Sequence, residues 1–158
     1  MLGYPLVASW ARTRATNFAR KGVVMHRKAT FKIFVTRREM LYVGDTPDHS
    51  LMLTEMEGEP VDYTPGEAGK FISRRSVGFH DRTKGEGPMQ GYAVTHYEHG
   101  AVFSRFEGMR KNGTTTGTWK VYQGIGKLGN LQGSGTFEVK PSGKPGEFLL
   151  DMQGEYIL

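Results

Sequence analysis

Glycine and proline interrupt this sequence so often that few stretches could form a regular α-helix. The chain has 22 Gly and 7 Pro among its 158 residues. The pieces between them are short and rich in Thr, Val, Phe and Tyr, which is the composition of β-strands. In residues 29–36, for example, Phe31, Ile33 and Val35 alternate with other residues, although Phe34 breaks the polar side. We therefore expect an all-β fold.

About eight strand-like segments follow one another in residues 29–158, at the spacing of an antiparallel sandwich or barrel. The clearest hairpin joins residues 91–97 to residues 101–109 through a short loop that ends in Gly100. A single closed antiparallel barrel is favoured, because closure removes the edges that an open sheet would expose. An eight-stranded barrel encloses an interior that side chains can fill or that can hold one small ligand.

Length and composition narrow the classes of function. A chain of 158 residues is expected to form one domain. With no cysteine, the chain has no disulfides, no thiolate catalysis and no cysteine-bound metal. No apolar run approaches the roughly 20 residues of a membrane-spanning helix. We expect a soluble protein without a membrane span, with the cytoplasm favoured, although the body of the sequence does not fix the compartment.

Positive charge is concentrated at the beginning of the chain. The formal net charge is +5, yet residues 1–38 hold nine of the 21 basic residues and no acidic one, because the first carboxylate is Glu39. The rest of the chain has 12 basic and 16 acidic residues, a net charge of −4. A face that binds nucleic acid needs many Lys and Arg on one surface. We therefore expect no nucleic-acid partner.

Residues 1–28 form a basic N-terminal extension in front of the expected barrel domain at residues 29–158. The segment up to Val24 has the composition of an organelle transit peptide, being basic, acid-free and hydroxyl-containing. A mis-set translation start before Met25 fits as well. A disordered extension without chemistry is the simpler interpretation, and a helix from Val7 to Arg20 that packs on the fold is a further alternative.

Two motifs that could carry chemistry have plainer interpretations. Gly124-x-Gly126-x-x-Gly129 matches the dinucleotide-binding pattern, but that pattern works only where a strand leads into a helix. No helix is expected there, so we interpret these glycines as a tight loop between strands. His96 and His99 are close in sequence but lack a third ligand at a recognised spacing, so no metal site is predicted.

The last third of the chain has the most distinctive glycine spacing. It reads GYAVTHYEHG at residues 91–100, GTW at 117–119, GIGKLGNLQGSGTF at 124–137 and GEY at 154–156. This resembles the allene-oxide-cyclase-like barrel superfamily, in which a strand, a GTG–K–G–GxG loop and a paired strand recur near the C-terminus. Here the loop has Gly-Ile-Gly in place of Gly-Thr-Gly. Residues 43–55 also resemble a turn-and-strand segment of small bacterial members without assigned function.

The resemblance implies an eight-stranded, calycin-like barrel, often a homo-oligomer, whose open end admits an apolar ligand. Members include plant cyclases that act on a fatty-acid epoxide, bacterial cyclases that fold polyketides, and the similar dirigent proteins that steer radical coupling. They need no cofactor, because the cavity supplies shape and a few polar contacts. The site motif of the plant enzyme is not matched here, so none of its residues is transferred.

Candidate site residues follow from strand alternation. Phe103, Arg105 and Glu107 share one face of a predicted strand, and the residues between them share the other. If the first face lines the lumen, Arg105 and Glu107 form a polar anchor or acid–base pair. If it faces solvent, they are an ordinary surface pair, which we favour because charged residues are rarely buried.

The neighbouring strands add further candidates. Tyr92 and His96 share one face of the preceding strand, and Trp119 and Tyr122 lie on opposite faces of the following one. Rings with polar tips are typical of small-molecule sites, although core packing explains them equally well. The predicted catalytic residues are Arg105, Glu107 and His96, and the predicted ligand-binding residues are Tyr92, Trp119 and Phe103.

The sequence as a whole favours a barrel that binds a small, largely apolar molecule, such as a polyketide or lipid, in its lumen. If the protein is an enzyme, the expected reaction is cyclisation or isomerisation without a cofactor. The alternative is a non-catalytic ligand carrier or a structural oligomeric barrel with a filled lumen. The eight Met residues fit either, because Met lines adaptable cavities and fills cores alike.

Overall fold

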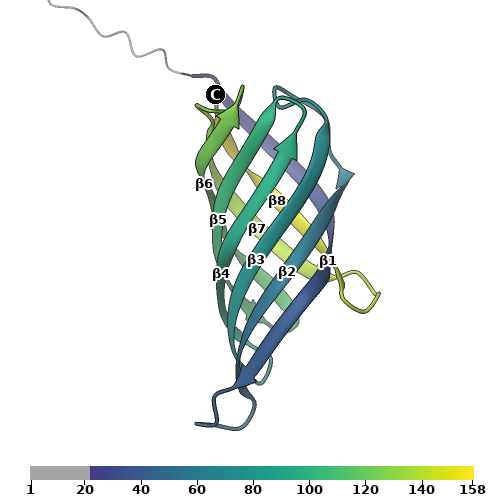
Figure 1. Cartoon of the computed structure of the whole chain (residues 1–158), viewed down its shortest axis with the longest axis vertical. Coiled ribbons are helices and arrows are strands. Elements are labelled where there is room, and N and C mark those ends of the chain that lie inside the picture. Colours follow the sequence, from purple (N-terminus) through teal and green to yellow (C-terminus); the bar gives the residue numbers. More distant parts are fainter. Residues whose placement is uncertain (1–21) are drawn as a thin grey trace, which may run out of the picture.

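The computed structural model describes residues 22–158, which form a closed barrel of eight antiparallel strands (Figure 1). The predicted all-β barrel is confirmed. The first strand begins at Val24, earlier than the expected boundary at residue 29. The helix considered for Val7 to Arg20 lies outside the described residues. The strands are β1 (Val24–Tyr42), β2 (His49–Asp62), β3 (Phe71–Thr83), β4 (Gly87–Tyr97), β5 (Gly100–Lys111), β6 (Thr114–Gly126), β7 (Gln132–Pro141) and β8 (Glu147–Ile157).

Each strand pairs with the next along the chain, and β1 closes the barrel by pairing with β8 from Val24–Ile157 to Phe34–Glu147. All connections are therefore hairpins. The turn predicted at Asn112-Gly113 is confirmed, since both residues have positive φ, 53° and 78°. Asn and Gly tolerate this left-handed conformation, which matches the twist of the flanking strands.

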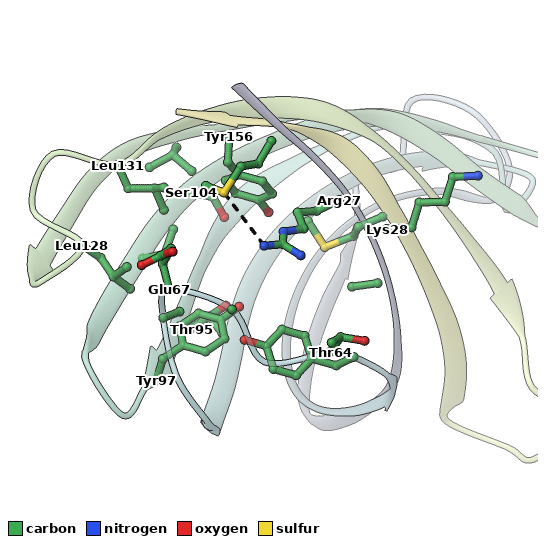
Figure 2. Close-up of a pocket in the computed structure, with 18 of the residues that line it drawn as sticks. Arg27, Lys28, Thr64, Glu67, Thr95, Tyr97, Ser104, Leu128, Leu131 and Tyr156 are labelled. Atoms are coloured by element: carbon green, nitrogen blue, oxygen red, sulfur yellow. Dashed lines mark hydrogen bonds between the residues drawn. The ribbon is translucent and has the colours of Figure 1, made fainter. Parts of the chain in front are cut away.

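The two ends of the barrel differ. At the upper end in Figure 1, where the C-terminus lies, the β2–β3, β4–β5 and β6–β7 loops surround an opening that Figure 2 shows in close-up. At the lower end, the long β1–β2 hairpin extends beyond the rest of the barrel. No helix that could span a membrane occurs in residues 22–158.

The glycine-rich segment before β7 differs partly from expectation. β6 continues to Gly126, so Gly124 is a strand residue that pairs with Val102, and only residues 127–131 form the loop. Leu128 in that loop is 2% exposed and covers part of the upper end. A strand leads into a loop here rather than into a helix, so the structural context of a dinucleotide-binding motif is missing.

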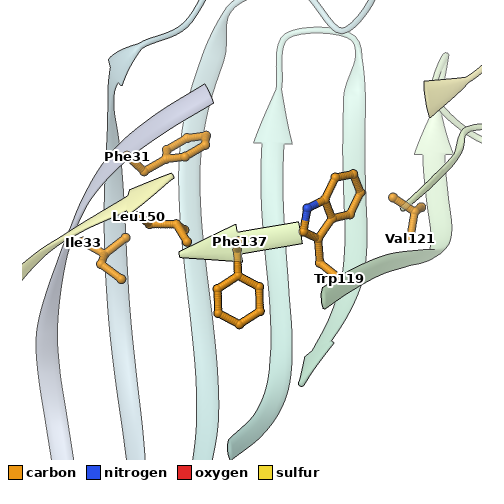
Figure 3. Close-up of a cluster of buried hydrophobic side chains, with 6 residues drawn as sticks. All are labelled: Phe31, Ile33, Trp119, Val121, Phe137 and Leu150. Carbon is orange, nitrogen blue, oxygen red and sulfur yellow. The ribbon is translucent and has the colours of Figure 1, made fainter. Parts of the chain in front are cut away.

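The core lies inside the barrel and comes from strands that are distant in sequence. Figure 3 shows its six buried side chains, which are Phe31, Ile33, Trp119, Val121, Phe137 and Leu150.

Glycines in the wall make room for the largest rings of this core. A Cβ at Gly154 would lie 2.5 Å from Trp119, and one at Gly117 would lie 2.8 Å from Phe137. Large and small residues thus alternate across the lumen, which lets eight strands close around bulky side chains.

Phe137 and Phe79 give a matched test of this inside–outside division. Phe137 is 7% exposed in the core, whereas Phe79 is 38% exposed on the outer face of β3. Phe137→Ala should lower the free energy of unfolding by about 3–5 kcal/mol, because it leaves a cavity. Phe79→Ala should cost about 1 kcal/mol or less. Urea denaturation measures both, and equal losses would contradict the assignment of faces.

A histidine between two carboxylates fixes the start of β2. His49 Nδ1 lies 2.6 Å from an Asp45 oxygen, and its Nε2 lies 2.7 Å from an Asp81 oxygen on β3. Both ring nitrogens thus face acceptors, which favours the protonated ring. The hydrogen bonds to Asp45 and then to Asp81 raise the pKa of His49 above its ordinary 6.5, and the bond to His49 lowers the pKa of Asp45.

This arrangement predicts a pH-dependent stability. A raised pKa means that the folded state holds the proton more tightly, so the stabilisation is complete below pH 6.5 and is lost as pH rises through the folded pKa. His49→Gln should therefore lower Tm most at about pH 6 and progressively less towards about pH 9. His26→Gln, which changes a histidine that is 77% exposed, is the control. A His49→Gln effect that does not vary with pH would refute this interpretation.

Candidate functional site

The lumen contains an upper cavity of about 280 Å³ that opens between the loops of the upper end. Its wall combines aromatic rings with a few polar groups. In Figure 2, Tyr97, Tyr156 and Ser104 lie around the cavity, and Leu128 and Leu131 border it from the β6–β7 loop. The volume is close to the lower limit of about 300 Å³ for small-molecule pockets. A filled, purely structural lumen does not describe this end of the barrel.

Arg74 on β3 is the central polar group of the lumen. Its guanidinium donates a hydrogen bond of 2.9 Å to Thr95 Oγ1 on β4 and lies 5.2 Å from the centroid of the Phe31 ring. The alternation of β3 requires this placement, because Arg74 and Arg75 are adjacent and point to opposite faces. Arg75 points outward and pairs with Glu55 at 2.9 Å.

No salt bridge within residues 22–158 involves Arg74. Burial lowers the pKa of Arg74 from 12.5, because the charged form has lost its water. An arginine nevertheless keeps its charge at neutral pH. A cation enclosed without a carboxylate is costly to folding. One hydrogen bond and one aromatic ring offset only part of that cost, so Arg74 is the clearest functional candidate in the cavity.

Phenol groups surround this cation. Burial raises the pKa of Tyr97 and of Tyr156, so both hydroxyls stay protonated and can donate hydrogen bonds. Neither hydroxyl has a partner within the described part of the chain, whereas Tyr63 donates to the carbonyl of Gly69 at 3.2 Å. Tyr97 and Tyr156 both line the upper cavity. Their hydroxyls are therefore free for a bound molecule.

The deep part of the cavity holds donors, and the carboxylates lie at its rim. Asp62 and Glu67 line the mouth but are exposed. Arg74, Tyr97 and Tyr156 supply the donors inside. Such a set can hold an oxygen that carries or develops negative charge. The bases that line the cavity, which are His26, Asp62 and Glu67, are all exposed. In the described residues, no group of three or more His, Asp and Glu is arranged to hold a metal ion.

Below Arg74 lies a lower cavity of about 80 Å³. The two cavities share four residues of the barrel wall, which are Arg74, Ser104, Trp119 and Met152. His80, Arg82 and Arg110 line the lower cavity but not the upper one, and they lie near the lower end of the barrel.

Of the six predicted site residues, the structure places only Trp119 in the lumen, where it lines both cavities and is 4% exposed. The other five lie on the outer face and line neither cavity. On β5 it is Val102, Ser104 and Phe106 that point inward. The five outer residues are Tyr92, His96, Phe103, Arg105 and Glu107.

This placement has a simple cause. Alternation shows which residues share a face but not which face is inside, and β4 and β5 carry polar and apolar groups on both faces. The phenyl ring of Phe103 packs on the outer surface against Tyr122, with ring centroids 6.3 Å apart. Any role of Arg105, Glu107 and His96 in chemistry would have to be exercised on the outer surface.

The sequence contains a signal for Arg74, which is not among the predicted site residues. Two adjacent arginines within a strand cannot both face solvent when one face of the strand lines a lumen. Arg74-Arg75 is such a pair within the strand-like segment ending at His80. Tyr97 and Tyr156, at the upper ends of β4 and β8, have no comparable signal.

No protein-family model and no functionally curated protein matches the chain. Solved structures do resemble it. A protein of unknown function from the DUF3224 family of Shewanella oneidensis is 15% identical, with 84% of this chain and 96% of that chain covered and a TM-score of 0.54. A pterocarpan synthase dirigent protein is 9% identical, with 95% and 99% covered and a TM-score of 0.50. At such identities the likeness shows the fold alone, that of a small antiparallel β-barrel.

Proposed function

We propose that this barrel binds a small, largely apolar molecule in its upper cavity and holds an oxygen of that molecule at Arg74. The observation that carries the proposal is the enclosed guanidinium without a carboxylate partner in the described chain, beside two free phenol hydroxyls. Aromatic walls favour an apolar skeleton. The cationic centre favours a carboxylate, an enolate or a polarised carbonyl oxygen.

The reaction that fits this site best is a cyclisation or isomerisation without a cofactor. Donors fixed around one oxygen stabilise negative charge that builds up there, and the cavity wall constrains the shape of the substrate. Membership of the allene-oxide-cyclase-like superfamily is part of this proposal. The likeness to a dirigent protein named as a pterocarpan synthase is in keeping with it, since that protein also has a small barrel.

A non-catalytic carrier is the second candidate, and the absence of a base among the deep residues of the upper cavity favours it. Native mass spectrometry of protein purified from its own source decides between the two. A co-purifying organic molecule would identify the class of ligand for both candidates. A cyclase or isomerase converts that molecule to an isomer of equal mass, detected by chromatography, whereas a carrier returns it unchanged. An upper cavity that binds no organic molecule would refute both.

Arg74 and Arg105 provide a matched pair of variants. We use 2-naphthoate and its neutral counterpart 2-naphthamide as probes and measure dissociation constants by calorimetry. The natural protein should bind the carboxylate more tightly than the amide. Arg74→Gln should weaken naphthoate binding by about tenfold to a hundredfold, since a hydrogen bond to a charged group contributes about 1.5–3 kcal/mol. Arg105→Gln should leave it unchanged. Equal binding of both probes, or a loss confined to Arg105→Gln, would contradict the proposal.

We also propose that the chain forms a homo-oligomer through its outer face. Tyr92 and Tyr122 are 54% and 55% exposed and stack edge to face with ring centroids 5.9 Å apart. Exposed apolar patches of this kind mark interaction surfaces. Tyr92→Ser should shift the native mass towards the monomer, whereas Tyr42→Ser, at a tyrosine that is 68% exposed on β1, should not. A natural protein that is monomeric at micromolar concentration would refute this proposal.

A further inference from the structure

A basic cluster lies around the lower cavity. Arg82 from β3 and Arg110 from β5 line it, and Arg38 from β1 lies near enough to act on both Arg82 and His80. His80 is 8% exposed. Besides Arg74, which also lines the upper cavity, the other groups facing the lower cavity are hydroxyls, such as those of Thr54 and Thr115, and apolar side chains. Arg82 and Arg110 thus face the cavity from two strands, and Arg38, whose side chain is exposed, adds a third positive charge nearby.

No carboxylate balances this charge in the described part of the chain. Arg38, Arg82 and Arg110 make no salt bridge there. Burial, followed by repulsion from Arg110 and Arg38, lowers the pKa of Arg82 to about 10. These arginines therefore oppose one another, and their arrangement costs folding free energy unless something negative joins them.

The hydrogen bonds of the cluster leave one buried donor without a partner. Arg82 donates from Nη2 to Nδ1 of His80 at 3.4 Å, and Nε2 of His80 lies 3.0 Å from Thr54 Oγ1. His80 is therefore neutral, with its proton on Nε2. Burial and then repulsion from the three arginines lower the pKa of His80 to about 4, which is consistent with a neutral ring. The Nε–H of Arg82, however, is buried and has no partner within residues 22–158.

We propose that the lower cavity is a binding site for an oxyanion, namely a carboxylate, phosphate or sulfate group. Such a group supplies the acceptor that Arg82 Nε lacks and the negative charge that the three arginines lack. The cavity of about 80 Å³ has room for it, since one water needs roughly 10–15 Å³. The site is distinct from the proposed upper site, because His80, Arg82 and Arg110 line only the lower cavity, whereas Arg74 lines both.

The first test uses inorganic phosphate at constant ionic strength, with chloride as the reference salt. Phosphate should raise the Tm of the natural protein, because an ion that binds only the folded state stabilises it. Arg82→Met should weaken the apparent affinity for phosphate at least tenfold. Without phosphate, the same variant should be as stable as the natural protein or more so, because it removes repulsion and an unpaired donor. Arg105→Met, on the outer face, is the control that should change neither quantity.

Further readouts keep the test decisive if Arg82→Met does not fold. Arg110→Met should weaken phosphate binding in the same way. In the natural protein, NMR titration of His80 should show that phosphate raises the pKa of His80, because the ion offsets the arginines. No phosphate effect on Tm together with an unchanged His80 would overturn a site for a free ion, and so would equal phosphate binding by Arg82→Met and Arg105→Met.

A second arm separates a free ion from the acid group of an organic ligand. Benzoate and phenyl phosphate are compared with inorganic phosphate in the same variants. Binding of all three supports a site open to free ions, whereas binding of the organic acids alone supports a site for the acidic end of a larger molecule. If none of them binds in a manner that depends on Arg82 or Arg110, the proposal is overturned. Because Arg74 lines both cavities, a dependence on Arg82 and Arg110 is what identifies the lower site, and a dependence on Arg74 without them identifies the upper one.

Discussion

The hydrogen bonds between β1 and β8 are the constraint on which the rest of the structure depends. Eleven residues of β1, from Val24 to Phe34, pair with β8, and the same strand also pairs with β2. Without this closure the molecule would be an open sheet with two unpaired edges and no interior. With it, every strand acquires an inner and an outer face, and the outer face no longer has to cover a core. Both cavities are a consequence of that closure.

Acidic and basic side chains form ion pairs on the outside of the barrel, whereas the charged groups inside it are arginines. Ion pairs such as Lys32–Glu59, Arg75–Glu55 and Lys140–Glu138 lie on partly or largely exposed side chains, where water screens them and they contribute little to stability. Inside, the strands contribute arginines and neutral donors. A lumen of one sign that is enclosed by a low-dielectric wall concentrates its field along the axis of the barrel. It therefore selects for molecules that bring an acceptor or a negative charge with them.

Much of the fold could be predicted from the sequence because turns and alternation are local properties. Asn112-Gly113 and the hairpin loop before Gly100 mark strand ends directly, and alternation in residues 29–36 identifies a half-buried strand. The role of the glycines at 117 and 154 could not be predicted in the same way, because they leave space for aromatic rings of other strands rather than form turns. That role depends on contacts with residues far away in sequence, and a single sequence does not show which distant residues are in contact.

The candidate site was less predictable, because its residues depend on which face of each strand is inside. Among the predicted residues, Trp119 reached the lumen since it is the largest apolar side chain of its strand, and burying it contributes most. On β5, Arg105 and Glu107 lie on one face, and Ser104 lies between apolar residues on the other. The barrel buries the serine face, because one hydroxyl costs far less to enclose than two charges.

A bulge in β1 shows how sensitive the lumen is to this inside–outside choice. Val35 pairs with Met56 and Arg37 pairs with Glu55, so Thr36 is an extra residue without a partner in the ladder. Its hydroxyl instead donates to the carbonyl oxygen of Glu55 at 3.2 Å. The bulge changes which residues of β1 face inward. Beyond it, Arg38 pairs with Thr54, a residue of β2 that lines the lower cavity, so Arg38 lies on the inner side of β1.

Without this extra residue the alternation would continue unbroken, and Arg37 and Glu39 would point into the lumen. Those two side chains form an ion pair on the exterior instead. The bulge therefore has two effects at once, because it brings Arg38 towards His80 and Arg82 and it keeps the carboxylate of Glu39 outside. A single inserted residue thus helps to keep the lower lumen positively charged, which is the condition under which an oxyanion from outside the chain can bind there.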